Sequence, residues 1–172
     1  VDYMTEHLGI AAETLPKRLL QRHGLTTTFL SHFKPLRPSA LLVSLQEEFP
    51  DSSGLPPFAW TEEIATAVYK IAKTIEVRAA GIVAAAILAL LTLAGEVPEE
   101  GSDTLGRDLE LGVGYTGGCI VHFQDYLHDC QVFLDRLLGK RFGQVSPLRV
   151  VLSPCHDGGV TGAGILVAAA SQ

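Results

Sequence analysis

Residues 109–118 read LELGVGYTGG, a short apolar run that enters a glycine-rich turn. A second apolar run, LRVVLS at 148–153, enters the turn SPCHDGGVTGAG at 153–164. Helical spacing of apolar residues follows each turn, at 122–140 and at 163–170. The order strand, turn, helix, strand, turn, helix is typical of parallel strands whose turns lie at the same end of the sheet. These residues predict a helix-rich α/β fold built on a short parallel βαβα unit.

The remaining helices are predicted from apolar periodicity and from turn residues. Residues 61–95 predict one long helix, and the second half of it is apolar all round, which indicates a central buried helix. We prefer this interpretation to a membrane span because the uncharged run is short and rich in alanine. Residues 4–23 predict a helix that Pro16 kinks or divides. The helix over 122–140 is expected to close at Gly139.

The length and composition indicate a globular protein with a substantial core. The chain has 172 residues, 47% of them hydrophobic, with a mean hydropathy of +0.27, which predicts a single domain over 1–172. Residues 25–60 carry much of the proline and predict a surface insertion around one short helix, 39–48, capped by Ser39.

Charge and cysteine content exclude some classes of partner. The net charge of -6 and the isoelectric point near 5.4 disfavour nucleic acid and anionic membranes. Three cysteines cannot all pair within one chain, and no secretory signal opens the sequence, so we predict a cytoplasmic protein without a membrane span.

Each turn carries residues that suggest chemistry, but their spacing does not match an established pattern. Cys119 lies three residues before His122, and Cys155 adjoins His156 and Asp157. These side chains include zinc ligands and the three residue types of a catalytic triad. Because neighbouring residues rarely point inward together, we predict no metal site, no cofactor and no triad.

The same residues resemble the C-terminal, large-domain part of the hexokinase family, and the resemblance covers nearly the whole chain. The run IAKTIEVRAAGIVAAAILALL at 71–91 resembles the family's central helix, and GVGYTGG at 112–118 its Gly-Val-Asp-Gly-Ser/Thr turn. HFQDYLHDCQVFL at 122–134 is similar to the helix that follows. Residues 148–170 resemble the last strand, adenosine-side loop and final helix, and residues 3–26 the helix after the sugar-binding residues. The resemblance implies an actin-like, ribonuclease-H-like fold.

Departures from the family pattern affect the expected activity. Gly114 stands where the family has Asp, and Tyr115 where it has Gly. In the second turn the family's Asp-Gly-Ser-Gly-Lys-Gly becomes Asp-Gly-Gly-Val-Thr-Gly at 157–162. Val160 therefore adds a β-branched side chain where a backbone had room, which disfavours adenosine packing.

Other family features have no matching positions in this sequence. They are the small domain with its catalytic Asp, the sugar segment, the Glu pair on the sugar hydroxyls and the first phosphate turn, so the resemblance implies no sugar-kinase activity. It also implies a truncated sheet that has lost three strands. An exposed sheet edge and an uncovered apolar helix predict self-association, so we expect a homo-oligomer, for example a homodimer.

We predict that this hexokinase-like remnant, a pseudokinase, is repurposed to bind a hydrophobic small molecule in the cleft at the two turns. Any reaction would be that of a cofactor-independent cyclase, isomerase or lyase of secondary metabolism. The alternative is a regulatory pseudo-hexokinase fragment that acts as an interaction module, with both turns structural. The predicted catalytic residues are His156, Asp157 and Tyr115, and the predicted ligand-binding residues are Thr116, Gly117, His122, Gly158, Val160 and Thr161.

Overall fold

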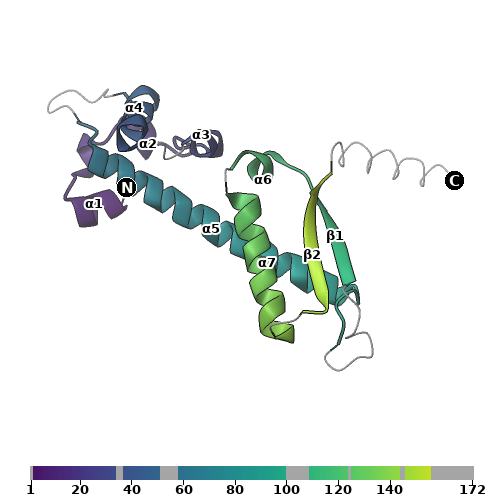
Figure 1. Ribbon diagram of the computed structural model, residues 1–172. Coiled ribbons are helices and arrows are strands. Elements are labelled where there is room, and N and C mark those ends of the chain that lie inside the picture. The colour runs from purple at the N-terminus through teal and green to yellow at the C-terminus, as the bar shows by residue number, and fades with distance from the viewer. Residues whose placement is uncertain are drawn as a thin grey trace. The chain divides into compact units, whose positions relative to one another are not determined.

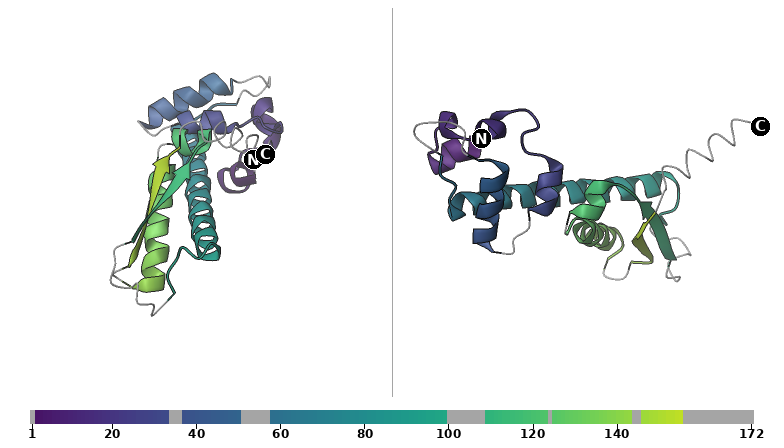
Figure 2. Two further views of the ribbon diagram at one scale, coloured as in Figure 1. Left: turned by 90° about the vertical axis from the view of Figure 1, so that its right-hand side faces the viewer. Right: turned by 90° about the horizontal axis from the view of Figure 1, so that it is seen from above.

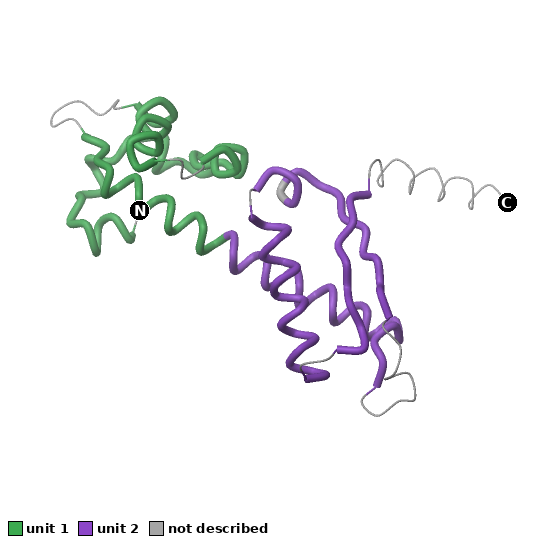
Figure 3. Tube along the Cα trace, in the orientation of Figure 1, with its two compact units in different colours: residues 1–75 green, residues 76–172 purple. Residues whose placement is uncertain are grey.

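The computed structural model describes residues 2–33, 37–50, 58–99, 109–123, 125–143 and 146–155, with Cys119 described by its backbone alone. The chain divides into two compact units, Val1–Ile75 and Glu76–Gln172 (Figure 3). The boundary falls inside the long helix α5, Glu62–Leu93, so one helix contributes to both units. Each unit has its own hydrophobic core. The single domain expected over 1–172 stays a prediction.

Unit 1 consists of short helices and the first part of α5. The helices are α1 (Asp2–Leu8), the 3-10 helix η1 (Ala12–Thr14), α2 (Lys17–Leu20), α3 (Thr27–His32) and α4 (Pro38–Glu48). The helix predicted over 4–23 is therefore divided, as Pro16 allowed. Gly9 leaves the helical region with a φ of 64°, and Pro16 stands at the N-cap of α2 because it lacks the N–H that a helix interior needs.

The proline-rich segment supplies much of the core of unit 1, which corrects its prediction as a surface insertion. Phe33, Phe49 and Trp60 are at most 7% exposed. The Trp60 indole Nε1 donates a hydrogen bond to the Phe49 carbonyl over 2.9 Å, which ties the start of α5 to the end of α4. Burial of these aromatic side chains stabilises unit 1, so this part of the segment belongs to the core.

Two local features of this segment also differ from the prediction. Helix α3 was not expected; the Thr26 side chain caps it by accepting a 3.1 Å hydrogen bond from the Phe29 N–H. Helix α4 begins at Pro38 with Arg37 as its N-cap, so Ser39 is not the cap. Proline suits the first helical position because its missing N–H would have no partner inside the helix.

Unit 2 is a helix-rich α/β unit around a two-stranded parallel sheet, as predicted. Its elements are the second part of α5, β1 (Leu109–Tyr115), α6 (Gly118–His122), α7 (Tyr126–Phe142) and β2 (Leu148–Pro154). The strands pair in parallel from Leu109 opposite Leu148 to Tyr115 opposite Pro154 (Figures 1 and 2). The predicted helix over 122–140 becomes α6 and α7. Gly139 lies inside α7, which ends at Phe142 and is followed by Gly143 as its C-cap, where a φ of 86° favours glycine.

Helix α5 has the predicted extent but is not buried all round. Ala80 and Ala84 are fully buried against α7 and the sheet, whereas Ile82, Leu90 and Leu93 are 58–84% exposed. The sheet and α7 cover one face of this part of the helix, so only 11% of its most apolar window is buried. Among the described residues, α5 is the helix with the length and composition of a membrane span, a property that core helices of soluble proteins share.

Candidate functional site

The turn after β1 lies at the carboxyl ends of both strands, where the sequence predicted the site. The Cys155 N–H donates a 2.8 Å hydrogen bond to the Tyr115 carbonyl, so the ladder continues one residue beyond β2. Tyr115 is half-buried, and Cys155 is exposed beside it. A Cβ placed on Gly114 would lie 3.4 Å from the Cys155 Cβ, an ordinary contact distance. The turns after β1 and β2 therefore begin side by side.

Thr116 and Gly117 form the first turn, and His122 is the last residue of α6. Gly117 has a φ of 120°, a backbone conformation that side chains rarely permit, and α6 begins at the next residue. The His122 ring lies close to Gly118, with its Cδ2 atom 3.7 Å from the position of a Cβ there. Thr116 and His122 are exposed. The turn thus offers the Thr116 hydroxyl next to the Tyr115 ring, and the His122 imidazole is exposed at the end of α6.

The described part of the second turn ends at Cys155. The other predicted site residues lie outside the described residues; they are His156, Asp157, Gly158, Val160 and Thr161. Of the predicted site residues, Tyr115 is the last residue of β1, Thr116 and Gly117 form the turn, and His122 is the last residue of α6. The cleft that both turns were expected to line stays a prediction.

The cysteines differ sharply in their surroundings. Cys130 on α7 is fully buried, and its Sγ atom donates to the Ala80 carbonyl over 3.5 Å. Burial, with a smaller contribution from the Asp129 charge, raises the pKa of the Cys130 thiol to about 11. This thiol packs α7 against α5 and is a poor nucleophile. Within the described ranges, no three His, Cys, Asp or Glu side chains converge to hold a metal ion.

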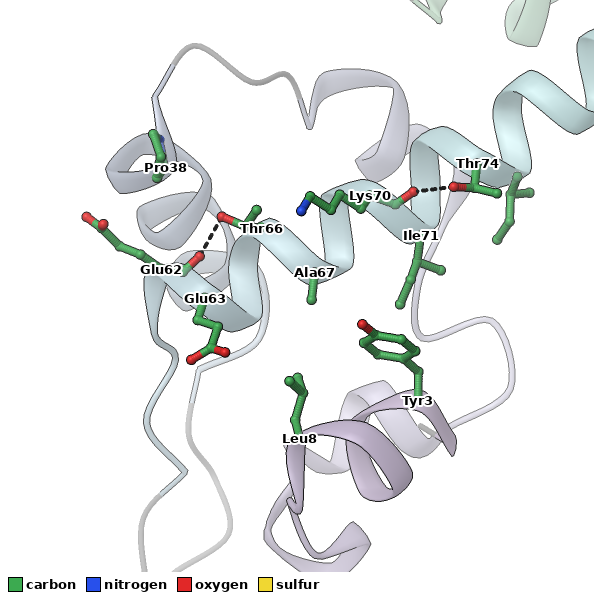
Figure 4. A pocket seen from close by; sticks show the side chains of 11 residues that line it. Tyr3, Leu8, Pro38, Glu62, Glu63, Thr66, Ala67, Lys70, Ile71 and Thr74 are labelled. Carbon is green, nitrogen blue, oxygen red and sulfur yellow. Dashed lines mark hydrogen bonds between the residues drawn. The ribbon is translucent and has the colours of Figure 1, made fainter.

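A pocket of about 670 Å³ lies in unit 1 between α1 and α5 (Figure 4). This volume is within the roughly 300–1,000 Å³ of typical ligand pockets. Its lining residues are Tyr3, Leu8, Pro38, Glu62, Glu63, Thr66, Ala67, Lys70, Ile71, Thr74 and Ile75. On α5 this pocket lies along the first half of the helix, where small and polar residues alternate with apolar ones.

The pocket combines an apolar floor with polar groups along α5. Tyr3 and Leu8 of α1 face Ala67 and Ile71 of α5. The Thr66 hydroxyl donates to the Glu62 carbonyl over 2.7 Å, so its oxygen can still accept a hydrogen bond from a ligand. The pocket can hold an apolar body with a polar end, and sequence reasoning missed it.

Comparison with known proteins identifies the family. A search of curated proteins found no match to the chain. The family model described as Hexokinase matches residues 1–169, which include both units and both glycine-rich turns. The chain therefore belongs to the hexokinase family.

Proposed function

We propose that this chain is a hexokinase-family domain that does not itself transfer phosphate and that binds a small apolar molecule at the turn after β1. The proposal rests on the residue types at the carboxyl end of β1 and in the turn that follows it. Gly114 provides no carboxylate where the family has Asp, and Tyr115 adds a half-buried ring where the family has Gly. The fold proposed for the whole family region is actin-like, and the parallel β1 and β2 joined by helices support it.

The chemistry of the turn favours an apolar ligand over a phosphate. Phosphoryl transfer needs a positioned base and a metal-bound nucleotide. The residues 114–118 contain no acid and no cation. Tyr115 offers contact area, and Thr116 offers one hydrogen bond, which suits a molecule with an apolar body and a single oxygen.

A reaction at this site would use residues of the second turn. We propose that His156 and Asp157 orient or polarise one oxygen of the ligand, as in a cofactor-independent cyclase, isomerase or lyase of secondary metabolism. Such catalysis depends on shape and on a few well-placed hydrogen bonds. Both residues follow Cys155, whose N–H is bonded to the Tyr115 carbonyl.

The test uses 2-naphthol as a neutral probe with an apolar body and one hydroxyl. Amide chemical shifts at Tyr115 and Thr116 should move on titration, and Tyr115→Ala should weaken binding about tenfold, whereas Tyr115→Phe should retain it. Ile71→Trp, which fills the pocket of unit 1, is the matched control and should leave binding unchanged. Shifts confined to α1 and α5 would move the binding function to that pocket. Glucose-dependent ADP release by the purified chain would overturn the proposed loss of phosphoryl transfer.

A second candidate function is an interaction module without chemistry. The exposed apolar side chains of α5 in unit 2 favour it, since Leu90 and Leu93 are 66% and 84% exposed. A contiguous exposed apolar patch typically marks an interaction site. Under this function 2-naphthol does not bind at the turn. A photoreactive residue at position 90 would then cross-link to one defined partner, and one at the exposed Val43 of α4 would not.

A further inference from the structure

Helix α7 packs against β2 (Figure 1), and the Gln131 side chain joins the helix to the outer edge of the strand. The amide nitrogen donates to the Val150 carbonyl over 2.7 Å, and the amide oxygen accepts from the Leu152 N–H over 3.4 Å. The same nitrogen donates to the Asp135 carboxylate, one turn along α7, over 3.0 Å. A carboxylate only accepts and an N–H only donates, so all three contacts require one orientation of the amide. Gln131 therefore needs a carbonyl and an N–H two residues apart on β2.

The apolar residues of the strands do not by themselves specify how β1 and β2 align. Alternate positions of both strands carry apolar side chains that pack in the core of unit 2. They are Leu109, Leu111, Val113, Leu148, Val150 and Leu152. A shift by one residue would turn these side chains to the opposite face of the sheet, which excludes that shift. A shift by two residues keeps apolar side chains on the core face, so another contact must select the register.

The exposed ion pair between Glu110 and Arg149 is a weak candidate for this contact. Its atoms lie 3.5 Å apart, and both side chains are more than half exposed. Exposed ion pairs contribute little to stability because water and salt screen the charges. The hydrogen bonds of Gln131 to the backbone are half-buried and are screened less.

The outer edge of β2 offers Gln131 one matching pair of backbone groups. In a strand the N–H and C=O of one residue point to the same side and successive residues alternate, so one residue in two points outward. The outward residues of β2 are Leu148, Val150, Leu152 and Pro154. The Ser146 Oγ atom donates to the Leu148 carbonyl over 2.7 Å and accepts from its N–H over 3.3 Å. Pro154 has no N–H. Of these four residues, only Val150 and Leu152 supply both groups.

We propose that Gln131 is a positioning residue that sets the register of β2 and, with it, the place of the second glycine-rich turn. A shift by two residues in either direction would bring the amide to the capped Leu148 or to Pro154, and one hydrogen bond to the strand would be lost. At about 3.3 Å per residue, the shift would move Cys155 and the turn after it about 7 Å along β1. The observed register lets the Cys155 N–H bond the Tyr115 carbonyl over 2.8 Å.

Ser146 and Pro154 each block one direction of the shift. Both residues belong to β2, so they move with the strand and present the same obstacle to Gln131 in the shifted register. A typical hydrogen bond changes a population ratio about two- to twelvefold, and a part-buried group left without a partner changes it further. This role of Gln131 does not depend on which ligand the two turns bind.

The register can be measured by disulfide trapping in the full chain with Cys119→Ser and Cys155→Ser. Glu110→Cys with Arg149→Cys reports the observed register, in which these residues lie opposite each other. Glu110→Cys with Val151→Cys reports a shift by two residues. In the observed register the Cα atoms of this second pair are about 8 Å apart, beyond the roughly 7 Å that a disulfide spans. No ligand is added, so the result is independent of the proposed function.

The first comparison removes the amide. Gln131→Met keeps the size of the side chain and loses its hydrogen bonds to β2, so the ratio of shifted to native cross-link should rise at least about fivefold. Arg136→Met, at an exposed position of α7, is the matched control and should leave the ratio unchanged. Ala84→Leu destabilises the core of unit 2 without touching the amide and should also leave it unchanged.

The second comparison gives Gln131 another matching pair. Pro154→Ala restores an N–H two residues beyond the Leu152 carbonyl, which permits the shift that brings Val151 opposite Glu110. The shifted cross-link should rise about two- to twelvefold when Gln131 is present. In the Gln131→Met background the same substitution should have no effect, because no amide remains to use the new N–H.

Three results would overturn the proposal. The first is an unchanged cross-link ratio in Gln131→Met. The second is an equal rise in Ala84→Leu, which would show that the register follows overall stability. The third is an effect of Pro154→Ala that is the same with and without Gln131. If Gln131→Met loses its helical circular dichroism, Pro154→Ala in the presence of Gln131 decides: a rise supports the proposal, and an unchanged ratio overturns it.

Discussion

The cores of the two units are built from different kinds of side chain. In unit 1, Phe49 is fully buried, with its ring 5.5 Å from that of Phe29 and 6.3 Å from that of Trp60. In unit 2 most of the buried side chains are aliphatic, and Ala80 and Ala84 are fully buried on the α5 face that α7 covers. Few large rings stabilise unit 1, whereas close approach of regular elements stabilises unit 2.

This difference shows which features of a sequence report burial. The core residues of unit 2 recur in the sequence at the spacing of a helix or of a strand. The helix or strand therefore places them on one side. In unit 1 the core also takes Phe33, Phe58 and Trp60 from the irregular stretches that flank α4, where no period exists. Each aromatic residue there contributes a larger share of the stability, so the two units should respond differently to substitution.

The largest effect is expected from Phe49→Ala. Removing this ring leaves a cavity beside Trp60 and should lower the free energy of unfolding of unit 1 by about 3–5 kcal/mol. Trp60 is the single tryptophan of the chain, so its emission reports unit 1 in a denaturant titration. Val43→Ala, at a 49% exposed position of α4, should change the midpoint little. An unchanged Trp60 transition in Phe49→Ala would show that unit 1 does not depend on its aromatic core.

A larger side chain should destabilise unit 2 at position 84 but not at position 85. Ala84→Leu inserts methylenes between α5, α7 and the sheet and should cost about 1–3 kcal/mol. Ala85→Leu lies on the exposed side of α5 and should stay within about 0.5 kcal/mol. Thermal unfolding followed by circular dichroism measures both. Equal losses would mean that the exposed side of α5 is packed in solution.

The buried thiol predicts a loss of stability at alkaline pH. The pKa of Cys130 is about 11 in the folded chain, against an ordinary value of 9.0. A raised thiol pKa favours folding below pH 9, and this contribution is lost as pH rises from about 9 to 11, by at most about 1.4 kcal/mol for each pH unit. Urea titrations across this window should show the decline, and Cys130→Ala should remove it.

Iodoacetamide in a Cys119→Ser background should label Cys155 much faster than Cys130.

The smallest effects are expected from the surface ion pairs, and here too the units differ. Arg18 pairs with Glu48, donates to the Glu48 carbonyl over 3.0 Å and lies 5.5 Å above the Phe49 ring. Arg18→Ala should cost about 0.5–1 kcal/mol. Arg149→Ala breaks a single exposed pair with Glu110 and should cost less than about 0.5 kcal/mol at concentrations where the chain is monomeric. Denaturant titrations at low and high salt measure both, and a larger loss for Arg149→Ala would reverse the comparison.

Periodicity in the sequence determined β1, β2, α5 and most of α7, together with the parallel pairing of the strands. These elements follow from side chains at fixed spacing, and the helical crossover between β1 and β2 returns the chain to the same end of the sheet, which makes the strands parallel. The sequence also placed Tyr115, Thr116 and Gly117 at the end of β1, because they are neighbours in the chain. The cleft that these residues, His122 and the second turn were expected to line stays a prediction. The break before α2 at Pro16 followed from the missing N–H of proline, whereas the end of α1 at Leu8 was not predicted.

Only the tertiary structure decided the features that depend on residues far apart in the chain. The Gln131 amide caps the edge of β2, Phe49 and Trp60 form a core from the irregular segment, and the pocket of unit 1 opens between α1 and α5. Period and composition do not specify which face of α5 is covered. The physical reason is that burial and edge capping are set by contacts between elements, whereas a local pattern specifies only the element itself.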